Sequence, residues 1–228
     1  MKNIKNIYFN GYRVQMKGYR SYIFDLDNTI VDSSRGYTIA FSRAFEEYGI
    51  PYHEEKYNEY IRMPFNTLFS QYYPNSPCKY RDFVSLIVST YDKTHLDCVR
   101  LFPDAEACLD VLVKKERSLG IVSNSYTKHI NGILSKLGII DLFASVVGTD
   151  RVVMSKPDPE PVLLCISEMD SVPGDTIMVG DSDNDVIAGN LAGSDTALVD
   201  RTGAVRREES PTFNISSLSE LIDTKIIW

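Results

Sequence analysis

The sequence has few cysteines, few histidines and no long apolar stretch. Its four cysteines, Cys78, Cys98, Cys108 and Cys165, form no C-x-x-C pair, so neither a zinc cluster nor a dithiol redox centre is predicted. The three histidines show no H-E-x-x-H spacing. No apolar run approaches the roughly 18 residues of a membrane-spanning helix, and the polar N-terminal segment does not resemble a signal peptide. We therefore expect no membrane association and a reduced, cytoplasmic setting.

The rest of the composition is that of an ordinary globular protein with an acidic balance. The chain has 228 residues, of which 43% are hydrophobic and 24% charged, and its formal net charge is −7. A chain of this length can bury a substantial core as one domain that carries a smaller insertion. Nucleic-acid binding needs basic surfaces, so the negative charge disfavours it. A small anionic ligand remains compatible, because a local site can oppose the overall charge.

Strands and helices are predicted to alternate through most of the chain. Residues 19–24 form an apolar run typical of a buried strand that ends at Asp25. Further strands are predicted at 119–123, 144–148, 176–180, 196–199 and 213–215, and helices at 105–115, 128–137, 160–169, 185–192 and 218–222. Repeated units of this kind predict an α/β fold, a Rossmann-like parallel sheet with helices on both faces.

Residues 34–100 interrupt this alternation, because their sequence pattern is purely helical. Its apolar side chains recur at helical spacing and no strand-like run intervenes, so we predict an inserted all-helical subdomain with a largely aromatic core. The catalytic core would then comprise residues 19–33 and 101–228. Residues 1–18 are predicted to form either a hairpin that turns at Asn10-Gly11 or a disordered extension.

Polar side chains gather where the predicted strands end, and a parallel sheet brings such positions to one edge. They are Asp25, Asp27, Thr29, Ser123, Asn124, Lys156, Asp181 and Asp185. Carboxylates at close range repel one another unless a cation lies between them. Mg²⁺ suits a site of a few carboxylates plus water, so we predict that it binds Asp25, Asp27, Asp181 and Asp185.

The same groups predict chemistry on a phosphate ester. Asp25, at the strand end, is the better nucleophile and would form an aspartyl-phosphate. Asp27 would protonate the leaving oxygen and then activate water. Lys156 would neutralise both the carboxylates and an incoming phosphate. Ser123 and Asn124 would donate hydrogen bonds to phosphate oxygens.

These residues resemble the motifs of the haloacid dehalogenase superfamily of aspartate-nucleophile hydrolases. The match consists of Asp25-x-Asp27-x-Thr29, Ser123 after a strand, Lys156 in Lys-Pro-Asp-Pro, and Gly180-Asp181-x-x-x-Asp185. It covers about residues 19–222. The layout, with a helical insert after the first motif, is similar to that of the phosphoglycolate phosphatase and β-phosphoglucomutase branch.

The resemblance carries further implications for single residues. It implies that Asp27 contributes its backbone carbonyl to Mg²⁺ and that Asp185 is more often an outer partner of the metal. It implies that Thr29 helps to hold the acid/base group or the phosphate. The helical insert would be a cap that closes over the site by hinging near Ser33 and Arg100.

Three functions compete at this point. The motifs, with Asp27 present where dehalogenases lack an acid, favour a Mg²⁺-dependent phosphatase of a small phosphorylated metabolite, a phosphoglycolate or sugar phosphate, working as a monomer or homodimer. A phosphomutase would need cap cations that grip a second phosphate; Arg62 is a candidate, although a surface arginine is the better interpretation. A non-catalytic phosphoacceptor module is disfavoured, because such modules are shorter and lack an insert like 34–100.

Overall fold

The computed structural model divides the chain into two compact units. The first, here called the core unit, comprises Met1–Val31 and Leu101–Trp228. The second, here called the helical unit, comprises Asp32–Arg100. The structure describes residues 6–9, 12–15, 18–49, 51–63, 65–72, 80–201 and 210–222.

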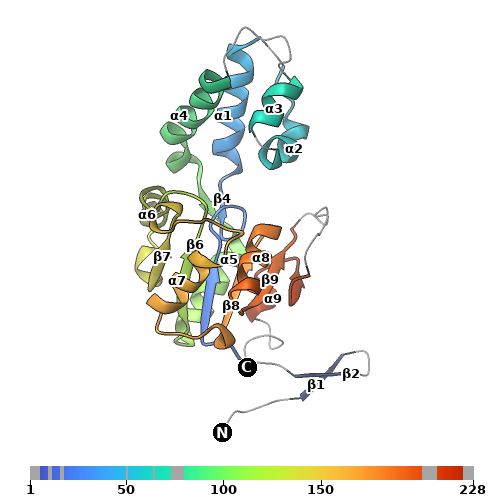
Figure 1. Ribbon diagram of the computed structural model, residues 1–228, viewed down its shortest axis with the longest axis vertical. Coiled ribbons are helices and arrows are strands. Elements are labelled where there is room, and N and C mark those ends of the chain that lie inside the picture. Colours follow the sequence, from blue (N-terminus) through green and yellow to red (C-terminus); the bar gives the residue numbers. More distant parts are fainter. Residues whose placement is uncertain are drawn as a thin grey trace. The chain divides into compact units, whose positions relative to one another are not determined.

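A six-stranded sheet forms the centre of the core unit (Figure 1). Its strand order is β10-β9-β8-β3-β6-β7, and all neighbouring strands run parallel. The strands are β3 (Ser21–Phe24), β6 (Ser118–Val122), β7 (Ser145–Val147), β8 (Thr176–Gly180), β9 (Asp195–Val199) and β10 (Phe213–Ile215). All four residues of β3 are buried, which explains why three apolar residues, Tyr22, Ile23 and Phe24, follow one another without polar alternation. The sheet confirms the predicted Rossmann-like α/β class.

The loops after β3, β6 and β8 leave the sheet at nearly the same height along the strands. Phe24 pairs with Ile121 of β6 on one side and with Val179 of β8 on the other. The amide of Asp25 continues this ladder by donating to the carbonyl of Val179 at 2.8 Å. The carboxyl ends of the three strands are therefore aligned, as a ligand site at this edge requires.

Helices bury the sheet. Ile23 belongs to an apolar cluster with α7 (Glu160–Glu168) and α8 (Asp183–Leu191). Successive strand residues point to opposite faces, and Tyr22 lies near Cys108 of α5 (Pro103–Lys114). The remaining helical segments of the described core unit are α6 (Thr127–Lys136), η2 (Ile140–Leu142), η3 (Thr149–Arg151), η4 (Pro173–Asp175) and α9 (Ser219–Ile222).

Aromatic side chains from several helices form the core of the helical unit. Its helical segments are α1 (Ser34–Glu47), η1 (Glu54–Lys56), α2 (Tyr57–Arg62), α3 (Phe65–Tyr72) and α4 (Tyr80–Cys98). Phe41 and Phe45 of α1, Tyr60 of α2 and Phe83 of α4 are buried in one cluster. The rings of Phe45 and Tyr60 lie 5.0 Å apart, centre to centre. Tyr80, the first residue of α4, is by contrast 44% exposed.

Two pairs of short strands complete the described chain. β1 (Asn6–Phe9) and β2 (Tyr12–Gln15) pair antiparallel; the turn predicted at 10–11 lies outside the described residues. The two-residue strands β4 (Val31–Asp32) and β5 (Arg100–Leu101) mark where the chain leaves and re-enters the core unit. The sequence does not predict them, because two residues carry no periodicity. Within the described residues, no helix is both long and apolar enough to cross a bilayer.

Candidate active site

Lys156 binds the carboxylate at the end of the central strand. Its Nζ donates to Oδ1 of Asp25 at 2.7 Å, to Oδ1 of Asp185 at 2.5 Å and to the carbonyl of Val122 at 2.7 Å. The lysine side chain is 3% exposed. An ammonium group has three N–H donors, and these three bonds use all of them. The structure therefore directs Lys156 toward the carboxylates and the end of β6.

Three carboxylates converge on this point. One oxygen from each of Asp25, Asp181 and Asp185 lies within 4.8 Å of the others. Burial, with the charges of Asp185 and Asp181, raises the pKa of Asp25 well above its usual range, although Lys156 opposes the shift. Burial and then the charge of Asp185 raise the pKa of Asp181 to about 7. Burial alone would lower the pKa of Lys156, but its attraction to Asp185 and Asp25 raises it.

The donor set of this cluster fits a hard divalent cation. It offers carboxylate oxygens only, with no histidine or cysteine among the three residues. Three carboxylates lie beside one ammonium, so the cluster carries more negative than positive charge, and burial together with the neighbouring carboxylates raises the pKa of Asp25 and Asp181. Mg²⁺ favours such oxygen donors. The side chain of Asp27, a fourth predicted ligand, is not part of this cluster, but its charge contributes to the raised pKa of Asp181.

Asp185 is held from two sides. Its Oδ2 accepts hydrogen bonds from Oγ of Ser182 at 2.6 Å and from the amide of Ser182 at 3.1 Å. Because Lys156 donates a hydrogen bond to Oδ1, both carboxylate oxygens of Asp185 accept hydrogen bonds. The bond from the Ser182 amide belongs to a capping box, whose other half is a bond from the Asp185 amide to the Ser182 side chain, and α8 starts at Asp183, two residues before the predicted start.

Gly180, the last residue of β8, provides the space that Asp185 occupies. A Cβ at this position would overlap the Asp185 carboxyl group. We expect Gly180→Ala to lower the free energy of unfolding by about 1–3 kcal/mol in urea denaturation, because the carboxylate or the strand must shift. Gly174→Ala is the matched control, since its Cβ would meet no atom within 4 Å, and should change the value by less than about 0.5 kcal/mol. Equal losses in the two variants would contradict this packing argument.

The predicted phosphate-binding residues differ in how the structure places them. Ser123 is buried directly after β6, and its Oγ accepts a hydrogen bond from the amide of Ser125 at 3.1 Å. Asn124 donates from Nδ2 to the carbonyl of Lys156 at 3.0 Å, so this side chain orients the lysine segment. Thr29 is buried, and its hydroxyl has no hydrogen-bond partner among the described residues.

Two groups near this site carry no signal in the sequence. The carbonyl of Val122 accepts one of the three lysine bonds. Nη2 of Arg201 donates to the carbonyl of Thr29 at 2.9 Å, across a sequence separation of 172 residues. Neither has a local signal, because a carbonyl is common to every residue and the Arg201 contact depends on the finished fold.

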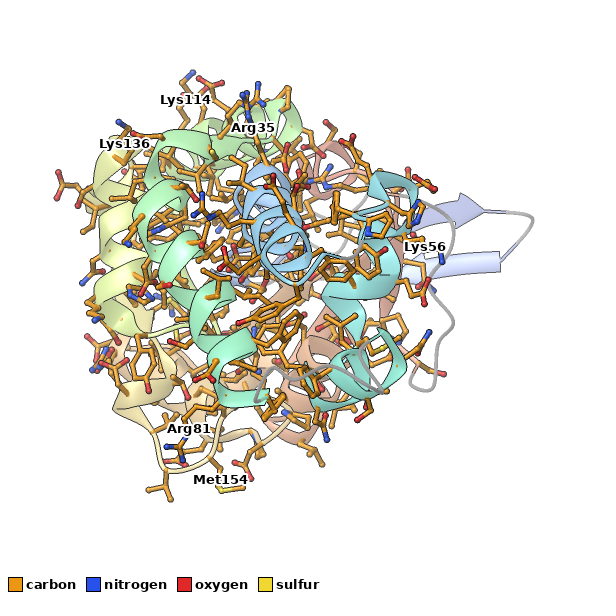
Figure 2. The ribbon with its side chains drawn as sticks, turned by 90° about the horizontal axis from the view of Figure 1, so that it is seen from above. Arg35, Lys56, Arg81, Lys114, Lys136 and Met154 are labelled. Atoms are coloured by element: carbon orange, nitrogen blue, oxygen red, sulfur yellow. The ribbon has the colours of Figure 1, made fainter. Side chains whose placement is uncertain are left out.

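The helical unit carries several cations besides Arg62. Arg35, Lys56 and Arg81 are exposed, and Figure 2 shows where they lie. The side chain of Arg62, the cation considered for a second phosphate, lies outside the described residues.

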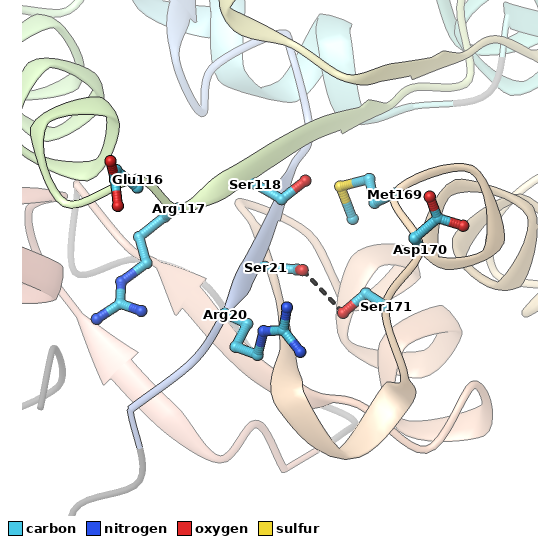
Figure 3. Close-up of a pocket in the computed structure, with 8 residues that line it drawn as sticks. All are labelled: Arg20, Ser21, Glu116, Arg117, Ser118, Met169, Asp170 and Ser171. Atoms are coloured by element: carbon cyan, nitrogen blue, oxygen red, sulfur yellow. Dashed lines mark hydrogen bonds between the residues drawn. The ribbon is translucent and has the colours of Figure 1, made fainter.

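A separate hollow lies at the opposite edge of the sheet, where β3 and β6 begin (Figure 3). It has a volume of about 100 Å³ and is lined by Arg20, Ser21, Glu116, Arg117, Ser118, Met169, Asp170 and Ser171. Its two arginines are matched by two carboxylates, and Oγ of Ser21 is already bonded to Oγ of Ser171 at 2.8 Å. Ligands of parallel sheets bind at the other edge, so we assign the chemistry to the Asp25 cluster.

Comparison with known proteins identifies relatives over most of the chain. The sequence pattern described as haloacid dehalogenase-like hydrolase matches residues 22–199. Pyrophosphatase PpaX from Bacillus velezensis is 31% identical over 205 residues, which cover 88% of this chain and 93% of that protein. Phosphoglycolate phosphatase from Aquifex aeolicus is 28% identical over 205 residues, covering 89% and 95%.

Solved structures share the architecture. A haloacid dehalogenase-like hydrolase from Bacteroides fragilis has a TM-score of 0.74 at 27% identity, covering 89% of this chain and 99% of that one. A candidate phosphatase from Clostridium difficile has a TM-score of 0.81 at 21% identity, covering 92% and 100%. At 21% identity, the similarity to the Clostridium difficile structure shows only that the two proteins share a fold.

Proposed function

Because this chain belongs to the haloacid dehalogenase-like hydrolase family, we propose that it is a Mg²⁺-dependent phosphatase of a small phosphorylated metabolite. The observation that carries the proposal is the buried cluster in which Lys156 bonds Asp25 and Asp185 beside Asp181. Such a cluster offers a carboxylate nucleophile, a fixed cation and a set of hard oxygen donors at one sheet edge. The phosphatase names of the PpaX and phosphoglycolate phosphatase relatives support the same enzyme class.

Asp25 is the proposed nucleophile. Lys156 fixes its carboxylate by holding Oδ1, and so limits the orientations it can take. One carboxylate oxygen forms a bond to phosphorus while the bond from phosphorus to the leaving oxygen breaks. The product of this step is an aspartyl-phosphate and a leaving group that needs a proton.

Asp27 is the proposed acid and base. It follows β3 by three residues and is only partly buried, so it can face the leaving group. It gives its proton to the leaving oxygen and then takes a proton from the water that attacks the phosphorus of the aspartyl-phosphate. The carboxylate of Asp25 is regenerated and inorganic phosphate is released. Asp27 returns to its protonated form, ready for the next turnover.

Asp25 and Asp181 are the residues that would hold Mg²⁺ through their side chains, with the carbonyl of Asp27 as the resemblance implies. When bound, Mg²⁺ would neutralise charge on the carboxylates and on the phosphoryl group. Asp185, whose oxygens both accept hydrogen bonds from protein groups, is proposed to act on the site mainly by holding Lys156.

The substrate is tested by a panel of phosphate compounds with Mg²⁺. Phosphoglycolate, pyrophosphate and hexose phosphates belong in it, because the relatives are named for the first two and the competing mutase would act on the third. Release of inorganic phosphate from at least one member supports a phosphatase. Isomerisation of a hexose phosphate without phosphate release would instead favour a phosphomutase.

Mg²⁺ dependence and pH should be linked at this site. Chelation by EDTA is expected to abolish phosphate release. The pKa of Asp181 is raised to about 7, so a proton occupies this carboxylate below that pH and competes with the metal. The half-saturating Mg²⁺ concentration, measured by activity and by thermal shift, should rise up to about tenfold from pH 7 to pH 6. It should change little above pH 8. An affinity that improves as pH falls would contradict this assignment.

The cysteines support a cytoplasmic setting for the proposed enzyme. Cys98, Cys108 and Cys165 are free thiols. Burial raises the pKa of the Cys108 and Cys165 thiols to about 12, which keeps both protonated and unreactive at neutral pH. Free, inert thiols are typical of proteins that work in reducing compartments.

A further inference from the structure

Arg201 makes an unusual set of contacts just beyond the end of β9. Its Nη1 donates to Oδ2 of Asp104 at 2.7 Å, and its Nη2 donates to the carbonyl of Thr29 at 2.9 Å. Its guanidinium carbon lies 4.0 Å from the centre of the Phe102 ring. The arginine side chain is 22% exposed and that of Asp104 14%. A partly buried guanidinium that bonds a carboxylate with one nitrogen and a backbone carbonyl with another is well suited to hold that backbone in place.

The Thr29 carbonyl belongs to the turn that carries Asp27. The amide of Asn28 donates to the carbonyl of Val31 at 2.8 Å, and the amide of Val31 donates to the carbonyl of Leu26 at 3.0 Å. Asn28 has φ of 58°, a left-handed conformation that asparagine tolerates better than most residues. These bonds close the turn within itself. Arg201 connects it to the rest of the core unit.

Asp104, at the other end of this connection, is held by further hydrogen bonds. Oδ2 of Asp104 also accepts hydrogen bonds from Oγ of Ser217 at 2.8 Å and from the amide of Leu218 at 2.9 Å. The amide of Phe102, beneath the guanidinium, donates to the carbonyl of Ile30 at 3.1 Å. Arg201 therefore ties the Asp27 turn to the start of α5 and to the segment before α9.

We propose that Arg201 is a positioning residue for the phosphoryl-transfer step, which it serves by fixing the turn that presents Asp27. The inference rests on the proposed function, in which Asp27 protonates the leaving group. A turn that moves by about 1 Å can cost up to roughly 100-fold in rate, because proton transfer depends on a short donor–acceptor distance. Arg201 touches no member of the Asp25 cluster, and its contact with Thr29 is to the backbone carbonyl, not to the hydroxyl.

The test compares Arg201→Met with a control that loses a similar pair of bonds elsewhere. Arg151 also joins a carboxylate, Oε1 of Glu168 at 2.5 Å, to a backbone carbonyl, that of Val146 at 2.7 Å. Arg151→Met therefore measures the general cost of losing such a link. We expect Arg201→Met to lower kcat/KM on an alkyl phosphate by about tenfold or more, and Arg151→Met by less than about twofold. Arg201→Lys should lie between wild type and Arg201→Met, because one ammonium cannot reproduce the two-ended link.

The choice of substrate separates positioning from loss of stability. p-Nitrophenyl phosphate has a leaving group that departs without a proton, so a misplaced Asp27 matters less. We expect the loss in Arg201→Met to be at least about fivefold smaller on this ester than on an alkyl phosphate. Asp27→Asn should show the same pattern more strongly. A loss that is equal on both esters, or equal to that of Arg151→Met, would overturn the proposal.

A second measurement does not depend on turnover. Hydrogen–deuterium exchange of the amides in residues 26–31 should be faster in Arg201→Met than in wild type, and unchanged in Arg151→Met. Unchanged exchange in Arg201→Met would overturn the positioning role. If wild-type protein releases phosphate from no compound in the panel, the proposed function fails, and the exchange result still decides whether Arg201 holds the turn.

Discussion

Asp25→Asn is expected to reduce the rate of phosphate release by about 10⁴-fold or more, because the substitution removes the nucleophile while keeping the shape of the side chain. Folding should be preserved, since asparagine can still accept the hydrogen bond from Lys156 through its amide oxygen. Beryllium trifluoride, which mimics a phosphoryl group on a carboxylate, should stabilise wild-type protein with Mg²⁺ in a thermal shift experiment and should have no effect on Asp25→Asn. This second readout does not require turnover.

The control for this experiment is another hydrogen-bonded carboxylate of the core unit. Asp195 begins β9, at the opposite edge of the sheet, where it accepts hydrogen bonds from Tyr19 at 2.8 Å and Thr212 at 3.2 Å. Asp195→Asn should therefore keep activity within about twofold of wild type. Retained turnover in Asp25→Asn, with a normal response to beryllium trifluoride, would exclude the aspartyl-phosphate mechanism.

The core unit could be predicted from the sequence because its signals are local. The strand at 176–180 is bounded by Pro173 and Gly174 on one side and by an acidic turn on the other, and its predicted and observed limits agree. The sequence predicts α8 to start at Asp185, whereas the structure starts it at Asp183. The earlier start follows from the capping box of Ser182 and Asp185, and the same Asp185 carboxylate also belongs to the acidic cluster predicted to bind the metal.

The contacts within the site could be predicted only in part. A parallel sheet aligns the ends of its strands, so the meeting of Asp25, after β3, with Asp181, after the neighbouring β8, follows from topology. The third acceptor of Lys156, the carbonyl of Val122, depends on how the loop that carries the lysine folds, which no spacing in the sequence indicates. The link from Arg201 to Thr29 depends on two loops far apart in the sequence, and no spacing rule anticipates it.

Lys156→Met is expected to lower both activity and stability. Lys156 is the cation that balances Asp25 and Asp185, and removing it leaves both carboxylates buried without that partner. Without Mg²⁺, the free energy of unfolding should fall by about 3–5 kcal/mol. Lys114→Met is the control. This substitution removes an ion pair between Lys114 and Asp110, whose side chains are 71% and 57% exposed. The free energy of unfolding should therefore fall by less than about 1 kcal/mol. Figure 2 shows Lys114 on the surface of the core unit.

The pH dependence of this loss identifies its cause. The pKa of Asp25 is raised by burial even with Lys156 present, and removing the lysine removes a group that lowers it. The folded variant then binds a proton at Asp25 at pH values where the unfolded chain, with a pKa near the ordinary value for aspartate, does not. Stability of the folded state in this window falls as pH rises. The deficit of Lys156→Met relative to wild type should therefore shrink as pH is lowered from about 8 to about 5.

Two further measurements separate buried charge from lost packing. Asp185→Asn in the Lys156→Met background removes one of the uncompensated carboxylates, so the double variant should be more stable than Lys156→Met alone. Mg²⁺ should likewise restore part of the stability at pH 8, because a bound cation replaces the lost positive charge. A deficit that is the same at every pH and insensitive to Mg²⁺ would mean that Lys156 contributes mainly by filling space. In that case the charge balance on which the proposed mechanism depends would be wrong.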